Sequence, residues 1–251
     1  MFTNEDLYNT RATQEELLAM MKDIHDFFER EKIVYSLTSG SLLGAVREKG
    51  FIPWDDDMDI MVDRHNFERI LSAFSGCKGY TLQRDLWVYR IRRETQERAS
   101  GYQPTVDIFV LDNVPKNKLS WKCKVLRLKI LQGMMKKKPE YGKYSFIQKL
   151  MVATTRCMGL FFTDNFKWKR YNKISQIGNK TPTKHKAMYN DLYKYLSVRY
   201  DANIMDKLQM HAFEDTQFYI TEKYDHCLKT LYGDYMTPPS NKNVHASEFI
   251  G

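Results

Sequence analysis

The pattern of apolar and polar residues changes along the chain. Before residue 115, short β-branched runs alternate with segments whose apolar residues recur at helical spacing. Helices are predicted after a capping box at residues 13–16 and after Asp63, a suitable N-cap. The runs predicted as strands are 33–38, 58–62, 80–83, 87–92 and 106–111. Because the later strands follow one another without intervening helices, we expect an α/β fold with a mixed sheet and flanking helices.

The composition shifts near Pro115, and helical patterns dominate beyond it. Residues 116–149 contain many lysines and a single acid, Glu140. We therefore predict a catalytic α/β core over residues 1–115. A basic, mainly helical region over 116–251 is expected to pack on that core, on its acceptor or membrane-surface side.

Segment 121–135 combines apolar residues at helical spacing with interleaved lysines and arginine. Such a helix can lie on an anionic lipid surface, or it can be an ordinary helix that packs its apolar stripe on the core, which is the commoner case.

Composition and charge limit the classes of function. A hydrophobic fraction of 43% excludes a disordered chain, and the four cysteines form no C-x-x-C pair. The longest apolar-rich stretch, 146–162, is interrupted by charges and is too short to span a bilayer. The net charge of +8 favours anionic partners. The polar, acidic start lacks a signal-peptide pattern, so we expect a cytoplasmic protein, with peripheral contact to the inner face of the membrane as an alternative.

The densest chemical signal is a run of carboxylates next to a predicted strand. Asp57 and Asp59 are two residues apart, so a strand would project both side chains to one face. Asp107 interrupts another apolar strand, where an ionised group needs a partner. If the two strands are neighbours, the three carboxylates can hold Mg²⁺ or Mn²⁺, and Asp55 or Asp56 can support the site from outside. The alternatives are a solvated acidic turn and, for Asp107, an ion pair with an arginine among residues 90–93.

A second signal is the small-residue turn at residues 39–41, Ser-Gly-Ser, which follows a predicted strand and precedes a short helix. The backbone N–H groups of such a turn bind phosphate well, so Gly40 and Ser41 are candidate phosphate ligands, with Arg47 in support. P-loop, dinucleotide-binding and zinc-protease patterns are absent from the sequence.

The order of these signals resembles the nucleotidyltransferase superfold. The segments GSLLGAVR at 40–47, KGFIPWDDDMD at 49–59 and VDIF at 106–109 resemble the LicD family of phosphocholine transferases, which are related to fukutin and fukutin-related protein. Near the end, YD at 224–225, LYGDYM at 231–236, PP at 238–239 and His245 resemble the family's C-terminal signature.

The resemblance implies a LicD-like phosphotransferase. Such an enzyme moves a phosphorylated alcohol, typically phosphocholine, from a CDP-activated donor to a sugar hydroxyl of a surface glycan or lipid-linked glycan and releases CMP. It implies that Asp57, Asp59 and Asp107 hold the metal, with Asp107 as the candidate general base. The rival interpretations are a nucleotidyltransferase that releases pyrophosphate and a non-catalytic basic protein that binds membrane or nucleic acid, although no nucleic-acid module accompanies the charge.

Overall fold

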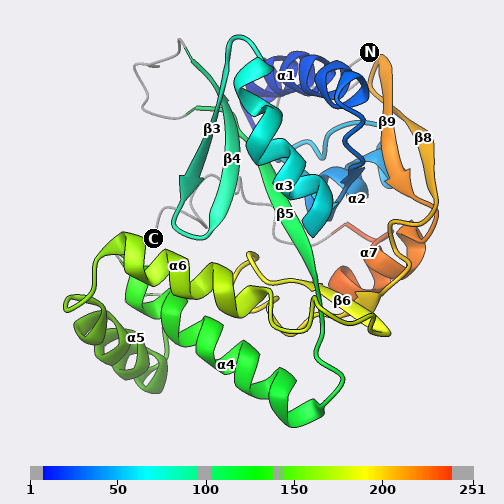
Figure 1. The fold of residues 1–251 in the computed structure, drawn as a ribbon. Helices are drawn as coiled ribbons and strands as arrows, with labels where there is room; N and C mark the ends of the chain where they lie inside the picture. Colours follow the sequence, from blue (N-terminus) through cyan, green and yellow to red (C-terminus); the bar gives the residue numbers. More distant parts are fainter. Residues whose placement is uncertain (1–7, 95–102, 138, 140–141, 143, 239–251) are drawn as a thin grey trace. The chain divides into compact units, whose positions relative to one another are not determined.

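The structure is a computed structural model that describes residues 8–94, 103–137, 139, 142 and 144–238. The chain forms two compact units (Figure 1). Among the described residues, unit 1 comprises 8–83, 89–94, 103–110 and 203–238, and unit 2 comprises 84–88, 111–137, 139, 142 and 144–202. The chain enters unit 2 at residue 84 and again at residue 111, and it returns to unit 1 at residues 89 and 203. The predicted division at residue 115 stays a prediction.

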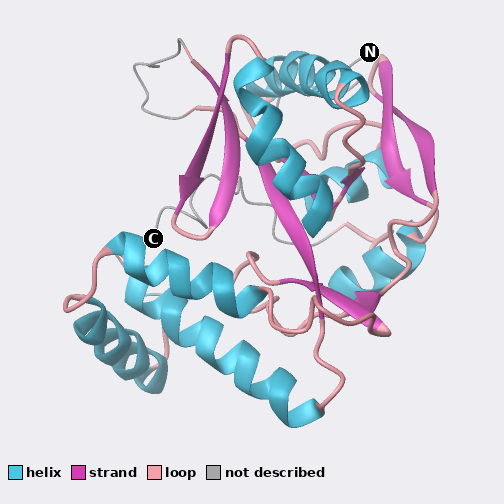
Figure 2. Ribbon diagram, in the orientation of Figure 1, coloured by secondary structure: helices cyan, strands magenta, loops and turns pink. Residues whose placement is uncertain are grey.

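Unit 1 is built on a sheet with the strand order β1-β2-β5-β4-β3 (Figure 2). The strands are β1 (Ser36–Leu37), β2 (Met58–Asp63), β3 (Tyr80–Asp85), β4 (Val88–Arg93) and β5 (Val106–Asn113). The flanking helices are α1 (Arg11–Arg30), α2 (Ser39–Arg47), α3 (Arg64–Ala73), the short 3₁₀ helix η1 (Phe74–Gly76) and α7 (Tyr224–Tyr232). A separate hairpin of β8 (Leu208–Phe213) and β9 (Thr216–Thr221) completes the unit.

Local sequence explains most of these elements. Asp63 caps α3 as predicted, because its side chain accepts a hydrogen bond from the backbone N–H of Asn66. The first helix begins at Arg11 with Thr10 as its N-cap, so the predicted capping box at 13–16 is wrong. Thr10 does not cap the helix with its side chain; its hydroxyl instead donates to the carbonyl of Pro53 at 2.7 Å. A tertiary contact therefore takes the place of a local one at this end of α1.

The described residues of unit 2 form the helices α4 (Lys118–Met135), α5 (Phe146–Gly159) and α6 (Asp164–Ser175). It also contains the short strands β6 (His185–Met188) and β7 (Tyr200–Asp201), and β6 pairs with the last residues of β5. The predicted fold class, a mixed α/β sheet with flanking helices and helices in the later part of the chain, is confirmed. The strands after residue 184, including the β8–β9 hairpin, were not predicted.

Helix α4 packs its apolar stripe inside unit 2. Val125, Leu128 and Leu131 are buried, which supports the core-packing interpretation of segment 121–135. Lys124 is buried too; its Nζ donates to two backbone carbonyls and lies 3.6 Å from the centre of the Tyr189 ring. No helix within the described ranges is long and apolar enough to cross a membrane.

Candidate active site

Three carboxylates from two neighbouring strands meet in unit 1. Asp57 precedes β2, Asp59 lies within it, and Asp107 lies in the adjacent strand β5. Each offers one carboxylate oxygen, and these oxygens all lie within 4.8 Å of one another. Asp59 and Asp107 are buried and Asp57 is half-buried. The structure thus brings together the three residues that we predicted as metal ligands; their role as ligands stays a prediction.

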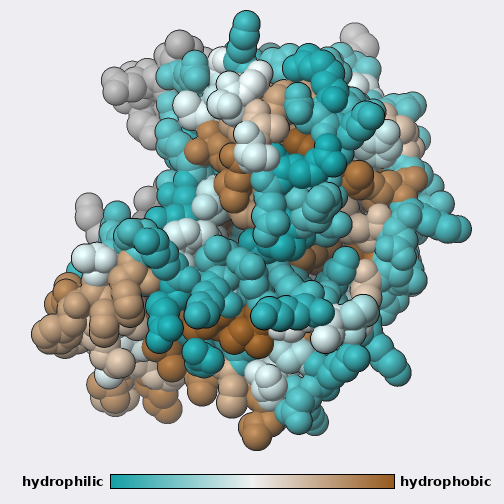
Figure 3. Space-filling model, viewed as in Figure 1, coloured by the Kyte–Doolittle hydropathy of each residue, from teal (hydrophilic) through white to brown (hydrophobic). Residues whose placement is uncertain are grey.

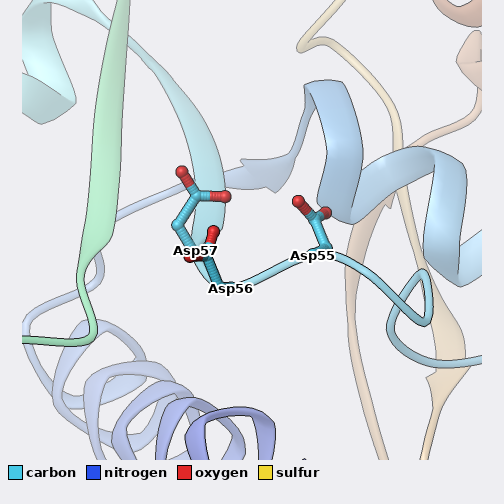
Figure 4. A group of neighbouring side chains, drawn as sticks. All are labelled: Asp55, Asp56 and Asp57. Carbon is cyan, nitrogen blue, oxygen red and sulfur yellow. The ribbon is translucent and has the colours of Figure 1, made fainter. Parts of the chain in front are cut away.

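A second acidic group shares Asp57 with the first. Asp55, Asp56 and Asp57 also each place a carboxylate oxygen within 4.8 Å of the others (Figure 4). The Asp55 carboxylate lies beside the first turn of α2, because a Cβ added to Gly40 would be 2.6 Å from its Oδ2. A side chain at position 40 would therefore displace Asp55. The continuous acidic group formed by Asp55, Asp56, Asp57, Asp59 and Asp107 is called the acidic cluster below.

The electrostatics of the acidic cluster favour a bound cation. Burial and the neighbouring carboxylates raise the pKa of the Asp57 carboxyl well above its ordinary value. Burial and the charge of Asp56 raise the pKa of Asp55 from 3.8 to about 7. Ionising these groups together is unfavourable unless a positive charge lies among them. Hard oxygen donors at this spacing fit Mg²⁺ or Mn²⁺ better than zinc.

Asp107 is also held by an arginine. It lies opposite Arg90 in the antiparallel pairing of β4 and β5. The Arg90 Nε donates to Oδ1 at 3.0 Å and to Oδ2 at 3.1 Å, and the Thr105 hydroxyl donates to Oδ1 at 2.9 Å. Burial raises the pKa of Asp107, and these two partners lower it less than burial raises it. Asp107 therefore forms an ion pair with Arg90 and also lies beside Asp57 and Asp59, so the predicted ion pair and the predicted convergence of the carboxylates both occur.

The small-residue turn at the start of α2 lies against β2. Ser39 has a left-handed backbone (φ 47°), which is unfavourable for a residue other than glycine and is typical of functional turns. The Ser41 hydroxyl oxygen accepts a hydrogen bond from the backbone N–H of Asp59 at 2.8 Å. This bond connects the turn directly to the acidic cluster. Phosphate binding by Gly40 and Ser41 stays a prediction.

Arg47 lies at the other end of α2 from this turn. Seven residues at 1.5 Å rise place it about 10 Å along the helix from Gly40. Its Nη1 donates to the carbonyl of Tyr235 at 3.0 Å, and its Nε pairs with Glu48 at 2.7 Å. These contacts connect α2 to the chain after α7. Its predicted role with phosphate is therefore the least supported of the site assignments.

Three residues that sequence reasoning missed hold the loop before the aspartates. The Gln14 side chain donates to the carbonyls of Ile52 and Asp55, and Thr10 donates to Pro53. From the β8–β9 hairpin, Glu214 accepts from the backbone N–H of Phe51 at 3.0 Å. Gln14 could have been noticed, because it is a polar residue on the buried face of an amphipathic helix. Glu214 had no sequence signal, because it comes from a hairpin more than 150 residues away.

The described residues of the C-terminal signature, 224–238, make contacts within the protein. Asp225, in the first turn of α7, accepts from the Tyr235 hydroxyl at 2.9 Å and pairs with Lys229 at 2.8 Å. The backbone carbonyl of Tyr235 accepts a hydrogen bond from Arg47. Together these contacts hold α7 beside α2. Pro239 and His245 lie outside the described residues.

Comparisons with known proteins identify relatives of this chain. Residues 32–138 match the LicD/FKTN/FKRP nucleotidyltransferase domain. The chain is 27% identical, over 93% of its length and 93% of the relative's, to the lipopolysaccharide cholinephosphotransferase LicD of Haemophilus influenzae. An uncharacterized protein of Rickettsia prowazekii is 36% identical over 44% of this chain and 38% of its own length.

The matched region contains the turn at 39–41 and all five residues of the acidic cluster. The predicted resemblance and the predicted class of enzyme, a LicD-like phosphotransferase, are confirmed. This chain carries a nucleotidyltransferase domain of the LicD family over residues 32–138.

Proposed function

We propose that this chain transfers phosphocholine from CDP-choline to a sugar hydroxyl of a cell-surface glycan, such as a lipopolysaccharide, and releases CMP. The observation that carries the proposal is the convergence of Asp57, Asp59 and Asp107 beside the turn at the start of α2. The similarity to a lipopolysaccharide cholinephosphotransferase over nearly the whole chain supports the choice of substrate class.

In this proposal Asp57, Asp59 and Asp107 hold Mg²⁺ or Mn²⁺. When bound, the metal neutralises the negative charge of the donor diphosphate and of the departing CMP. Gly40 and Ser41 present backbone N–H groups to the donor phosphates. Because Gly40 has no side chain, the Asp55 carboxylate can lie beside this turn. The burial of the carboxylates lowers the local dielectric and strengthens their interaction with a cation.

Asp107 is the proposed proton acceptor for the attacking hydroxyl. Its Oδ1 accepts hydrogen bonds from both Thr105 and Arg90, whereas its Oδ2 accepts the longer bond from Arg90. Oδ2 is thus the oxygen with more capacity left for a proton. Arg90 keeps the carboxylate in one orientation, so we assign it as a positioning residue.

The experiment that tests the proposal measures CMP release. The purified full chain is incubated with CDP-choline, MgCl₂ and lipopolysaccharide, and nucleotides and labelled choline are followed by chromatography. We expect CMP and choline-labelled glycan in equal amounts, loss of both with EDTA, and a loss of at least a hundredfold in Asp59→Asn. Asp206→Asn, an exposed carboxylate outside the cluster, serves as the matched control and should keep full activity. Parallel reactions with CDP-ethanolamine, CDP-glycerol and CDP-ribitol identify the alcohol. Full activity of Asp59→Asn would refute the proposal.

A true nucleotidyltransferase is the second candidate, because the matched domain carries that description. It would use the same carboxylates but would combine a nucleoside triphosphate with an alcohol phosphate and release pyrophosphate. Assaying CTP and phosphocholine for pyrophosphate distinguishes the two reactions. If neither reaction occurs and Asp57→Ala with Asp59→Ala leaves lipid or nucleic-acid binding intact, the non-catalytic interpretation is correct.

A further inference from the structure

Helix α5 is a well-formed helix with almost no buried side. Of its residues Phe146–Gly159, only Gly159 is buried. Its start is fixed by a capping box in which Ser145 and Gln148 bond reciprocally. An amphipathic helix normally covers its apolar stripe with another part of the protein. The described part of unit 2 leaves the stripe of α5 uncovered.

The packing of α5 on α4 uses small residues and leaves the large ones outside. Thr155 lies so close to Gly133 of α4 that a Cβ there would be 2.3 Å from its hydroxyl oxygen, and Gly159 lies equally close to Met134. The large apolar side chains point elsewhere. We call the exposed group Phe146, Ile147, Leu150, Met151, Leu160 and Phe161 the α5 apolar face.

The side chains of this face are exposed to an unusual degree. Phe146 is 83% exposed and Phe161, in the loop after the helix, is 82% exposed. Brown residues gather over α5 in Figure 3, at the lower left of the molecule. Single exposed apolar residues are ordinary, but a contiguous group of this size marks an interaction surface.

The charge around the face indicates the partner. Residues 116–202 contain 21 lysines and arginines and four acids, whereas the rest of the chain contains 18 and 27. Within α5 the charged residues are Lys149 and Arg156, both exposed, and the helix contains no acid. A second copy of the chain would bring two strongly positive regions together, so self-association through this face is disfavoured. An anionic surface is favoured.

We propose that the α5 apolar face inserts into the interfacial layer of a membrane that carries anionic lipids. A helix of 14 residues is about 21 Å long, which is too short to cross the hydrocarbon core but suitable for lying in its surface. The phenylalanines and leucines enter the acyl boundary while Lys149 and Arg156 remain at the headgroups. This proposal places the lipid contact on α5, whereas the sequence offered it for segment 121–135 as one of two alternatives. The inference rests on exposure and charge and does not depend on the proposed reaction.

Vesicle flotation of the full chain tests this proposal. Vesicles contain either phosphatidylcholine alone or equal parts of phosphatidylcholine and phosphatidylglycerol. We expect binding to the anionic vesicles that is at least tenfold stronger than binding to the neutral ones. The double variant L160S/F161S should bind at least tenfold more weakly, because both side chains lose their apolar contact with lipid. Lys149→Glu with Arg156→Glu should remove the preference for anionic vesicles.

Matched controls separate insertion from a general effect. Leu71→Ser removes an exposed leucine of α3, and Lys78→Glu reverses an exposed charge of unit 1; both variants should bind like the wild type. Thermal unfolding checks that each variant is folded. CMP release measured without membranes should be equal in wild type and L160S/F161S, so failure of this inference is distinguishable from failure of the proposed function.

Three results would overturn the inference. The first is wild-type binding to vesicles by L160S/F161S, and the second is absence of binding by the wild type itself. The third is a wild-type dimer that becomes a monomer in L160S/F161S without any vesicle binding, which would assign the face to a second copy of the chain.

Discussion

Replacing Asp57 with asparagine tests whether the acidic cluster is built to hold a cation. Asp57 belongs to both acidic groups, and its oxygen lies within 4.8 Å of an oxygen of each other member. The pKa of its carboxyl is raised well above the ordinary value by burial and by these neighbours. The metal-free protein therefore contains a repulsion that Asp57→Asn removes without a change in side-chain size.

The size of the effect follows from Coulomb's law. At 4.8 Å, a pair of like charges costs about 3 kcal/mol with an effective dielectric constant of 20 and about 1 kcal/mol in water. Because Asp57 is half-buried and crowded neighbours take up protons, we expect a net gain of about 2 kcal/mol in the free energy of unfolding. For a chain of this size, this corresponds to a rise in Tm of about 6 °C.

The assay is thermal unfolding of wild type, Asp57→Asn and the control Asp206→Asn, each in EDTA and in millimolar MgCl₂. In EDTA the Asp57→Asn protein should have a higher Tm than the wild type. The control Asp206→Asn should have the same Tm as the wild type. In MgCl₂ the wild type should gain about 3 kcal/mol at a hundredfold excess over Kd, whereas Asp57→Asn should gain little. A variant that is less stable than wild type in EDTA, or that responds equally to Mg²⁺, would refute the reasoning.

Three further predictions concern the surroundings of the cluster. Arg90→Met leaves Asp107 as a buried charge without its guanidinium partner, so unfolding should be easier by about 3 kcal/mol, and adding Asp107→Asn should restore most of this loss in a double-mutant cycle. Glu214→Ala removes the acceptor of the Phe51 N–H; it should cost about 1 kcal/mol in unfolding and lower kcat for CMP release, whereas unchanged kcat would show that the loop needs no such anchor. The raised pKa of Asp55, about 7 against 3.8, means that the folded metal-free protein binds more protons than the unfolded one, so its stability should rise by about 3 kcal/mol as the pH falls from about 8 to about 5. Comparison with Asp55→Asn in EDTA isolates this contribution, and equal slopes for the two proteins would contradict it.

The sequence alone determined the features that depend on near neighbours in the chain. The two-residue spacing of Asp57 and Asp59 predicted that they lie together, and Asp63 was identifiable as the N-cap of α3, because both properties depend on residues only a few positions apart. Asp107 was identifiable as a residue in need of a partner, since a carboxylate within an apolar strand is costly.

The partners that these residues meet depend on how distant elements pack together. Strand pairing placed Arg90 opposite Asp107, and a distant hairpin placed Glu214 on the loop before the aspartates. The same holds for the helices of unit 2: α4 buries residues along its length, whereas α5 buries only Gly159. Burial and long-range pairing depend on how elements pack together, and this information is not present in the spacing of residues within any one element.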